Sequence, residues 1–317
     1  MNRQTRRFGT SWALVFGLWM GVFSISLFWG GASSIDLFII RELRFPRVFL
    51  ASILGMGLAV TGATLQSLFS NPLCEPYTLG ISSGAALGAV LGMSSGLLGL
   101  HGGVAGAAFL GAMVFAGILD FLARRPGSSN TMLLLAGVML GFLGSSVLSL
   151  WMVLSDSNGL QSVMAWLFGD LSRARLQGVF FTALGILLAV FLIWVQWRSL
   201  DALLLGEEGA ASLGLDVRTV RRRMIFLSSI VVGLCVSAGG MIGFVGLVVP
   251  HFVRRKVGSL HFKLIPFCAL WGSIVLTMAD WISRILVPPY ELPVGIVTAL
   301  IGAPLFLWAM LQRQVSS

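Results

Sequence analysis

Charged residues are scarce in this sequence. Of its 317 residues, 10% are charged and 57% are hydrophobic, whereas an ordinary soluble domain carries roughly 25% charged residues. The mean hydropathy is +0.94. A water-soluble fold could not cover its surface with so few charges. The composition therefore excludes an ordinary soluble protein and indicates one embedded in a membrane.

Lysine is rare, and the motifs of several enzyme classes are missing. The only lysines are Lys256 and Lys263, and no G-x-x-x-x-G-K-[ST] phosphate loop occurs, so we do not expect the chain to hydrolyse ATP. No H-E-x-x-H or Ser/His/Asp arrangement is present either. We therefore expect a protein that is not an enzyme.

Cysteine and histidine give no sign of a cofactor. The three cysteines, Cys74, Cys235 and Cys268, are widely spaced and set in apolar sequence, so neither a disulfide framework nor a metal site is predicted. We expect them to be buried packing residues. His251 has no Asp, Glu or Cys neighbours at metal-ligand spacing. We predict no metal and no cofactor.

Most of the chain consists of apolar blocks of about 20 residues, the length that an α-helix needs to cross a hydrocarbon core of roughly 30 Å. Backbone groups in lipid must bond internally, and unbroken apolar blocks lack the alternation of barrel strands. We predict an all-α membrane protein with about ten transmembrane helices in a compact bundle. The predicted spans are 11–30, 47–69, 79–98, 103–123, 132–154, 178–197, 224–239, 241–254, 264–283 and 293–311.

Two parts of this assignment carry alternatives. The seventh and eighth spans are joined by "SAGGMIGFVGLVVPH", whose glycines and proline could make them one broken element. The first span follows Arg3, Arg6 and Arg7, and it is longer than the roughly 7–15 apolar residues of a signal peptide. We interpret it as an uncleaved span, with cleavage near Ala32 as the alternative.

The basic residues favour one orientation. If the N-terminus is cytoplasmic, most Lys and Arg residues fall in inside segments, as the positive-inside rule requires. An even number of spans then places both termini in the cytoplasm. The net charge of +9 is attributed to this topology, so no nucleic-acid partner is predicted. The whole chain, 1–317, is predicted to form a single transmembrane domain.

A weak internal echo indicates two related halves. Arg47 precedes "GLAVTG" at the spacing at which Arg223 precedes "GLCVSAG". If the echo is real, spans 2–5 and 7–10 form an inverted repeat, because an offset of five spans reverses the orientation. Chance similarity among helices rich in Gly, Ala and Val is the alternative.

Segment 71–85, "NPLCEPYTLGISSGA", interrupts the apolar sequence between spans 2 and 3 with two prolines, an Asn and a Glu. One interpretation is a tight cytoplasmic re-entry that places Asn71 and Leu73 where a pathway could be closed. The other is an ordinary connection that proline terminates.

Residues 198–223 form the only sizeable hydrophilic region on the predicted cytoplasmic side. Glu207 and Glu208, followed by "GAASLG", predict two short helices broken at Gly209 and Gly214. Such a knob would offer small residues and carboxylates to a partner protein. A solvated connecting loop is the alternative.

Arginine also occurs on the predicted outside, where the positive-inside rule makes it scarce. Arg41, Arg44 and Arg47 lie in "RELRFPR", and Arg284 lies shortly before Glu291 of "PPYELP". These arginines could receive acidic groups of an external protein as charge-assisted pairs. Alternatively, they are helix-end arginines that reach the membrane surface.

Ionisable residues within the spans are nearly absent, and Asp280 is the nearest candidate. A secondary transporter needs a coupling-ion site, and a membrane-embedded enzyme needs a polar constellation at membrane depth. Both rival classes are therefore disfavoured.

Several long strings of the sequence resemble one family. They run from "RFPRVFLASILGMGLAVTGATLQSLFSNPLCEPYTLGISSGA" through "LLLAGVMLG" and "LGEEGAASLGL" to "GMIGFVGLVVPHFVRR" and "ELPVGIVTALIGAPLFLW". Over nearly its whole length the chain resembles the permease subunits of binding-protein-dependent ABC importers for iron-siderophores, haem and cobalamin.

The resemblance implies a homodimer of ten-span subunits in a bacterial inner membrane, with the translocation path between the two copies. Its partners would be two cytoplasmic ATPase subunits, which supply the energy, and a soluble periplasmic binding protein. The implied cargo is an iron-siderophore complex, on family frequency, with cobalamin or haem as the alternative. An ion-coupled secondary transporter is the distant alternative.

The resemblance also implies roles for particular residues. By similarity to the cobalamin importer, the element that contacts the ATPase would be Leu205, Gly206, Glu207, Glu208, Ala210 and Gly214. The arginines that meet the binding protein would be Arg44, Arg47 and Arg284. The cytoplasmic gate would be Asn71, Leu73, Asn130 and Thr131. Ser129 is the alternative counterpart if the alignment slips by a residue around "RRPGSSNTM".

Overall fold

A computed structural model of the chain describes residues 3–29, 37–95, 102–125, 127–155, 157–288 and 290–315. Over these residues the fold is helical, and extended pairing is confined to one isolated bridge between Val287 and Tyr290. The helical elements are α1 (Arg3–Phe28), η1 (Ile39–Arg44), α2 (Phe45–Leu68), η2 (Pro76–Leu79), α3 (Ile81–Ser94), α4 (Gly103–Ala123), α5 (Asn130–Leu154), α6 (Ser157–Leu167), α7 (Leu176–Val195), α8 (Trp197–Leu203), α9 (Gly206–Ser212), α10 (Val217–Gly239), α11 (Val245–Val257), α12 (His261–Ile285) and α13 (Val294–Val315).

Each predicted span overlaps one helix, but the helices differ in length. The apolar parts of α1 and α3 are short, Trp12–Phe28 and Ile81–Ser94, and α11 has 13 residues, or about 20 Å at 1.5 Å per residue. The all-α membrane fold is confirmed, whereas the count of ten spans and the inverted repeat stay predictions. Among the described residues, seven helices are long and apolar enough to cross a membrane: Ile39–Leu68, Gly103–Ala123, Asn130–Leu154, Leu176–Val195, Val217–Gly239, His261–Ile285 and Val294–Leu311.

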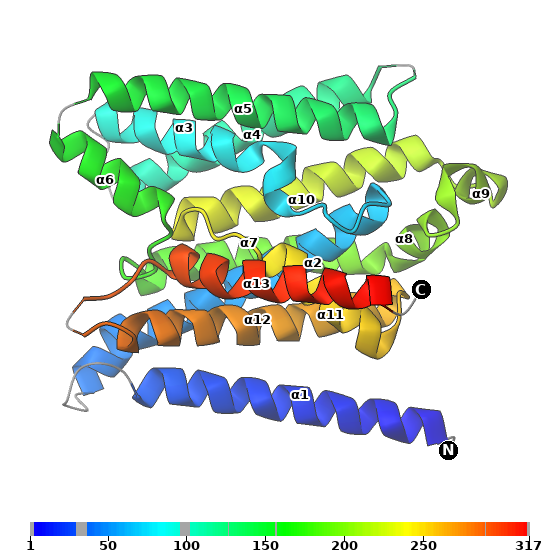
Figure 1. Cartoon of the computed structure of the whole chain (residues 1–317), viewed down its shortest axis with the longest axis horizontal. Helices are drawn as coiled ribbons and strands as arrows, with labels where there is room; N and C mark the ends of the chain where they lie inside the picture. The colour runs from blue at the N-terminus through cyan, green and yellow to red at the C-terminus, as the bar shows by residue number, and fades with distance from the viewer. Residues whose placement is uncertain are drawn as a thin grey trace.

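The helices lie side by side, mostly along the long axis of the molecule (Figure 1). Helix α1 forms one edge of the bundle and α5 the opposite edge. The first turn of α1 and the last turn of α13 lie at the end that carries α8 and α9, which we call the α9 end. We call the other end, where α2 begins and α12 finishes, the Arg47 end. The assignment of the α9 end to the cytoplasm stays a prediction.

Helix α2 is the centre of the core. Of its most apolar window, 89% is buried, and it packs against α7, α10, α11 and α12. A helix that is hydrophobic all round must be surrounded by other elements, which explains this position. The corresponding windows of α4, α5 and α7 are only 22–28% buried. These outer helices therefore offer apolar faces to lipid or to another protein.

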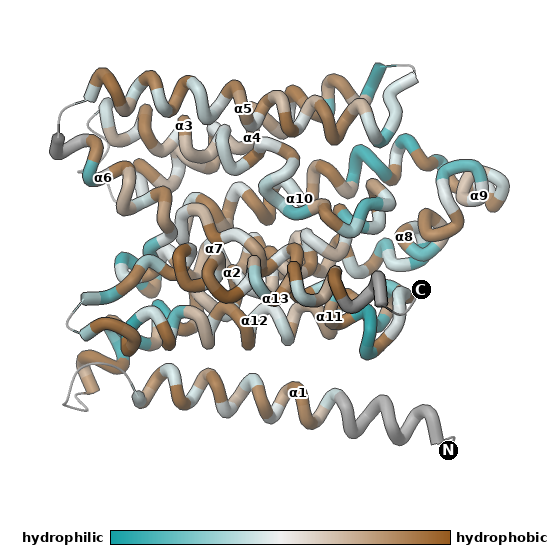
Figure 2. The backbone as a smooth tube through the Cα atoms, viewed as in Figure 1, coloured by the Kyte–Doolittle hydropathy of each residue, from teal (hydrophilic) through white to brown (hydrophobic). Residues whose placement is uncertain are grey.

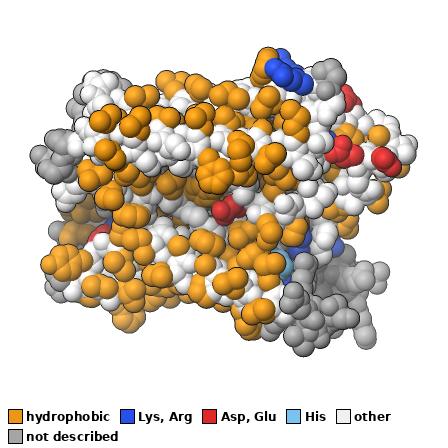
Figure 3. Space-filling model, turned by 45° about the horizontal axis from the view of Figure 1, so that its top comes forward, with side chains coloured by type: hydrophobic (Ala, Val, Ile, Leu, Met, Phe, Trp, Pro, Cys, Tyr) orange, Lys and Arg blue, Asp and Glu red, His pale blue; other side chains and the backbone are white. Residues whose placement is uncertain are grey.

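Hydrophilic and hydrophobic residues occupy different parts of the bundle. Hydrophilic residues gather mainly at the two ends of the bundle, while hydrophobic residues follow the helices between them (Figure 2). In the space-filling view, hydrophobic side chains are spread over the visible face between the two ends, and several acidic side chains lie at the α9 end (Figure 3). This distribution fits a bundle whose waist lies in a bilayer and whose ends meet water.

Close helix packing depends on glycine at three crossings. A Cβ atom on Gly55 of α2 would collide with the carbonyl group of Gly272 in α12, and one on Gly62 would collide with Gly246 in α11. In the same way, Gly88 of α3 lies against the backbone of α4. Small residues let helix backbones approach within membranes, where there is no hydrophobic drive between apolar helices.

The seventh and eighth spans are two helices separated by a break. Helix α10 ends at Gly239, and α11 begins at Val245. Between them Gly240 and Phe244 adopt positive φ values of 72° and 68°, and the value for Phe244 is uncommon for a bulky residue. The Tyr77 hydroxyl, from the segment after α2, accepts the backbone N–H of Ile242 in this break. The two irregular segments of the bundle thus contact each other.

Gly55→Ala is expected to lower the free energy of unfolding in detergent by about 1–3 kcal/mol, because the added methyl group overpacks the α2–α12 crossing. Thermal unfolding followed by circular dichroism measures the change. Gly117→Ala in α4 is the matched control, because nothing lies within 4 Å of a Cβ atom at that position. Equal effects of the two substitutions would contradict this packing.

Candidate functional site

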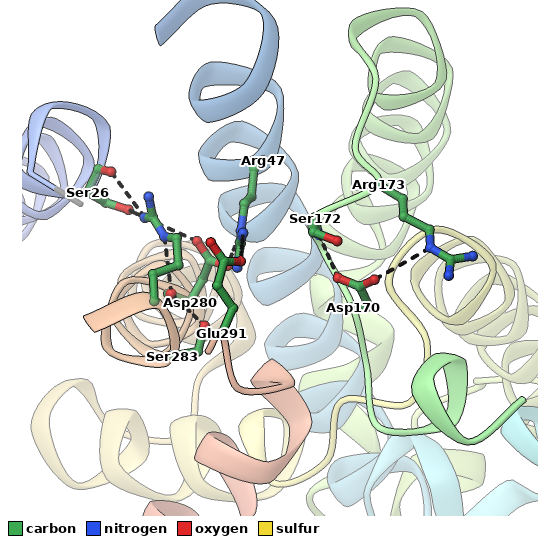
Figure 4. A network of polar contacts seen from close by, with 9 residues as sticks. Ser26, Arg47, Asp170, Ser172, Arg173, Asp280, Ser283 and Glu291 are labelled. Carbon is green, nitrogen blue, oxygen red and sulfur yellow. Dashed lines mark hydrogen bonds and ion pairs between the residues drawn. The ribbon is translucent and has the colours of Figure 1, made fainter. Parts of the chain in front are cut away.

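Four charged side chains form one network at the Arg47 end (Figure 4). Arg47 Nε lies 2.7 Å from Asp280 Oδ1, and Arg47 Nη1 lies 2.5 Å from Glu291 Oε2. Arg284 Nη2 lies 3.2 Å from Asp280 Oδ2, and it also donates to the backbone carbonyl of Ser26 at 3.1 Å. The network joins α1, α2, α12 and the α12–α13 connection.

Asp280 is the buried centre of this network. Its side chain is 0% exposed, that of Arg47 is 11% exposed, and that of Glu291 is 51% exposed. A buried charge is tolerated only when it is paired, and two guanidinium groups flank this carboxylate. Asp280 is thus the counter-charge of two arginines rather than an open site for a coupling cation.

The three arginines predicted to meet a binding protein have internal partners. Arg44 is buried, and it donates to the carbonyl groups of Leu27 and Phe28 at 3.3 and 3.2 Å, which satisfies the C-terminal carbonyls of α1. Arg47 and Arg284 are held by Asp280. Sequence reasoning missed these partners, although the i,i+4 spacing of Asp280 and Arg284 was a usable signal. Their role in docking stays a prediction.

Other charges at the Arg47 end are exposed. The side chain of Arg41 is 80% exposed and lies 3.7 Å from Glu42. In the α6–α7 connection, Asp170 accepts the backbone N–H of Ser172 at 2.7 Å and lies 3.6 Å from Arg173, which is 66% exposed (Figure 4). This end therefore presents both signs of charge to its surroundings.

At the opposite end, α8 and α9 form a projecting pair of short helices (Figure 1). The chain turns at Gly206 and Gly214, whose φ values are 83° and 81°. The predicted break at Gly214 is confirmed, but the one at Gly209 is wrong. Gly209 lies inside α9. The chain turns between α8 and α9 at Gly206 instead, where a positive φ favours glycine.

The residues predicted to contact an ATPase lie on α9 and in the turns on either side of it. Five of them are exposed, and Ala210 is buried. Just beyond α9, Asp216 caps α10 by accepting the backbone N–H of Thr219 at 3.1 Å, and the hydrogen bonds from Thr219 lower the pKa of the Asp216 carboxyl. The exposed members are Leu205, Gly206, Glu207, Glu208 and Gly214.

Arg221 joins this segment to the start of α5. Its Nη2 atom lies 2.5 Å from Glu207 Oε1 of α9, and its Nη1 atom donates to the Ser128 carbonyl at 2.9 Å. The Arg221 side chain is 5% exposed. Two neighbouring arginines of α10 bind the end of α4: Arg218 donates to the Arg124 carbonyl, and Arg222 pairs with Asp120 at 2.9 Å.

A second polar connection joins α8 to the end of α2. Asp201 accepts both the backbone N–H and the ring Nδ1 of His261 at 2.7 Å. In the tautomer whose Nδ1–H donates to Asp201, Nε2 is the acceptor and lies 2.7 Å from the Ser67 hydroxyl. Arg254 donates to Ser67 at 3.1 Å and to Gln66 at 2.7 Å.

The predicted gate residues lie on elements that meet at the α9 end. Asn130 donates through Nδ2 to the Leu68 carbonyl at 3.1 Å, which brings the start of α5 to the end of α2. Asn71 Oδ1 accepts the backbone N–H of Leu73 at 2.9 Å, so its side chain shapes the turn after α2. Leu73 and Thr131 are exposed.

Ser129, the alternative gate residue, is the N-cap of α5. Its hydroxyl accepts the backbone N–H of Met132 at 3.2 Å, which caps α5. Sequence reasoning did not find Arg221, Asp201 or His261. Their only sequence signal is the position of an ionisable residue near the start of a helix, which is also where ordinary helix-end charges lie.

Together the fold and these ends define a multi-pass helical membrane protein with a projecting two-helix segment. Within the described part of the chain, no group of three or more His, Cys, Asp or Glu residues could hold a metal ion. The model of the FecCD transport family matches residues 10–312. The chain therefore belongs to the FecCD transport family, which confirms the resemblance seen in the sequence.

Individual proteins are similar to the chain over most of its length. The vitamin B12 import system permease protein BtuC of Vibrio cholerae serotype O1 is 39% identical over 305 residues, which cover 96% of this chain and 90% of that protein. The hemin transport system permease protein HmuU of Yersinia pestis is 38% identical and covers 93% of this chain and 90% of its own.

A solved structure has the same fold. It is an inward-facing conformation of a metal-chelate type ABC transporter, with a TM-score of 0.85 and 32% sequence identity, and the match covers 93% of this chain and 97% of that one. The chain is therefore an ABC permease by family, by sequence similarity and by fold.

Asp280→Asn is expected to cost about 3–5 kcal/mol of stability, because it leaves two buried guanidinium groups without their shared carboxylate. Unfolding in detergent, followed by tryptophan fluorescence, measures this change. Glu291→Gln removes a half-exposed partner of the same arginine and should cost no more than about 1 kcal/mol. If Asp280→Asn is as mild as Glu291→Gln, the network does not stabilise the bundle in this way.

Proposed function

We propose that this chain is the permease subunit of an ATP-driven importer that moves a metal chelate across the cytoplasmic membrane of a bacterium. The observation that carries the proposal is similarity over nearly the full chain to permeases named for vitamin B12 and hemin import. The projecting α8–α9 segment supports it, because a permease without an ATPase site needs a surface through which a separate ATPase can act.

Three kinds of cargo belong to the proposed class. The names of the similar permeases favour cobalamin or haem, whereas the iron-siderophore complex rests on family frequency alone. All three are large metal chelates, for which we propose a path lined by apolar side chains that bind weakly. We therefore propose a metal chelate as the cargo class and test its three members directly.

The partners of this chain follow from its proposed role as an importer permease. We propose a second copy of this chain, two ATPase subunits at the α9 end and a soluble binding protein at the Arg47 end. The weak burial of α5 and α13, at 22% and 33% of their apolar windows, leaves apolar faces for a second copy. Asp280, held by two arginines, argues against the ion-coupled alternative.

For docking of the binding protein, we propose that Arg44, Arg47 and Arg284 shape the rim of the Arg47 end. Arg47 is the member best placed to exchange partners, because Glu291, one of its two carboxylates, is half exposed. An incoming carboxylate could replace Glu291 while Asp280 keeps its place. Such an exchange would be weakened by salt.

For coupling, we propose that α8 and α9 transmit motion of the ATPase to the gate. Two polar connections support this proposal: Glu207–Arg221–Ser128 leads to α5, and Asp201–His261–Ser67 leads to the end of α2. Of the proposed gate residues, Asn71 and Leu73 follow the end of α2, and Asn130 and Thr131 are the first residues of α5. Arg221 is buried, so its separation from Glu207 would leave a buried guanidinium group without its carboxylate, and the pair can therefore transmit displacement.

The proposed function predicts ATP-dependent uptake. The chain is co-purified with the ATPase encoded beside its gene, placed in liposomes, and supplied with the neighbouring binding protein loaded in turn with iron-siderophore, haem and cobalamin. One cargo should be taken up only with ATP, and docking should weaken from low to high salt. Failure to assemble with the ATPase, or uptake driven by an ion gradient without it, would refute the proposal.

The coupling proposal predicts a loss of transport without a loss of ATP hydrolysis. In the same liposomes, Arg221→Gln and Glu207→Gln should each lower the cargo moved per ATP by about tenfold, the range expected for a charge-assisted hydrogen bond. The double variant should be no worse than Arg221→Gln alone, because that substitution already removes the contact with Glu207.

A matched control lies two positions away. Arg223→Gln removes an exposed charge of the same helix as Arg221, so the cargo moved per ATP should stay at the wild-type level. Additive effects of Glu207→Gln and Arg221→Gln would show that the two residues do not act as a pair.

A further inference from the structure

An apolar groove runs between α11, α12 and α13, along the side of the bundle. Its volume is about 670 Å³. Its walls are formed by Val249 and Phe252 of α11, Trp271 and Met278 of α12, and Leu305 of α13. Beside it, Phe306 of α13 packs on Leu247 and Val248 of α11. The three helices thus leave an apolar hollow between them.

Two cations lie at one end of the groove. Arg255 and Lys256, in the last turn of α11, belong to its lining. Arg255 donates through Nη2 to the Ala309 carbonyl at 3.0 Å, which holds its guanidinium group beside α13 and leaves further N–H donors. Among the described residues, the groove lining contains no carboxylate, and neither cation takes part in an ion pair.

The groove has the length of an acyl chain. Along α13 its lining extends from Thr298 to Trp308, a distance of about 15 Å at 1.5 Å per residue. The uncompensated positive charge lies at the end formed by Trp308, Arg255 and Lys256. A ligand that matches both features has an anionic head and a long apolar tail. A hydrophilic chelate would leave its polar groups unpaired against these walls.

We propose that this groove binds one anionic phospholipid. The phosphate lies on Arg255 and Lys256, and one acyl chain lies between α11, α12 and α13. Basic residues between transmembrane helices at the cytoplasmic surface are suited to anionic lipid headgroups, and the α9 end is the predicted cytoplasmic end. The bound chain would supply the packing that side chains do not supply here, so it would hold α13 against the bundle.

Native mass spectrometry of the purified permease tests this proposal. Delipidated protein is titrated with phosphatidylglycerol or with phosphatidylcholine of the same acyl chains. The wild type should retain one phosphatidylglycerol in preference to phosphatidylcholine. The double variant Arg255→Gln, Lys256→Gln should lose that preference by about tenfold or more. Arg223→Gln, Arg198→Gln removes two basic residues outside the groove lining and should keep it.

A second variant tests the acyl chain. Leu305→Trp adds bulk to the wall of the groove and should lower retention of phosphatidylglycerol while circular dichroism shows unchanged helix content. Competition by glycerol phosphate at the lipid's own concentration, equal retention of both lipids, or an unchanged preference in the Arg255→Gln, Lys256→Gln variant would each overturn the proposal. So would a disulfide between two copies that carry Met278→Cys, because it would make a second permease the occupant.

Discussion

A backbone that leaves its helix inside a bilayer has no water to bond, and this constraint governs the centre of the structure. The chain breaks between α10 and α11, and it breaks again after α2. Each irregular segment lies against the other, and the hydroxyl of Tyr77 takes up the amide of Ile242. The breaks are therefore interdependent. Helix α2, the most buried element, holds them together because it packs on both α10 and α11.

Charged side chains are arranged differently at the two ends of the bundle. At the Arg47 end, charges are paired internally around one buried carboxylate, which stiffens the junction of α1, α2 and α12. At the α9 end, buried polar groups connect a projecting segment to the helices beside it, through Arg221 and through His261. The first arrangement resists relative motion, whereas the second can transmit it.

The sequence predicted the helices well because apolar length and internal backbone bonding leave few alternatives in a membrane. It also located the break before Val245 and the projecting segment around Glu207. Side-chain partners were not predictable in the same way. Arg47 meets a carboxylate 233 residues away, and no local pattern specifies such a pair. The turn at Gly206 in place of Gly209 likewise depends on which glycine the packing forces to positive φ.

The long reach of the Arg47–Asp280 pair has a consequence for biogenesis. Helix α2 leaves the ribosome long before α12, so Arg47 enters the membrane region while its carboxylate partner has not yet been made. Until α12 arrives, that guanidinium group must remain at the water-facing surface or be neutralised by lipid phosphate. Insertion of α12 then removes the charge from water and fixes the depth of α2 in the membrane. The last third of the chain thus completes the placement of the first.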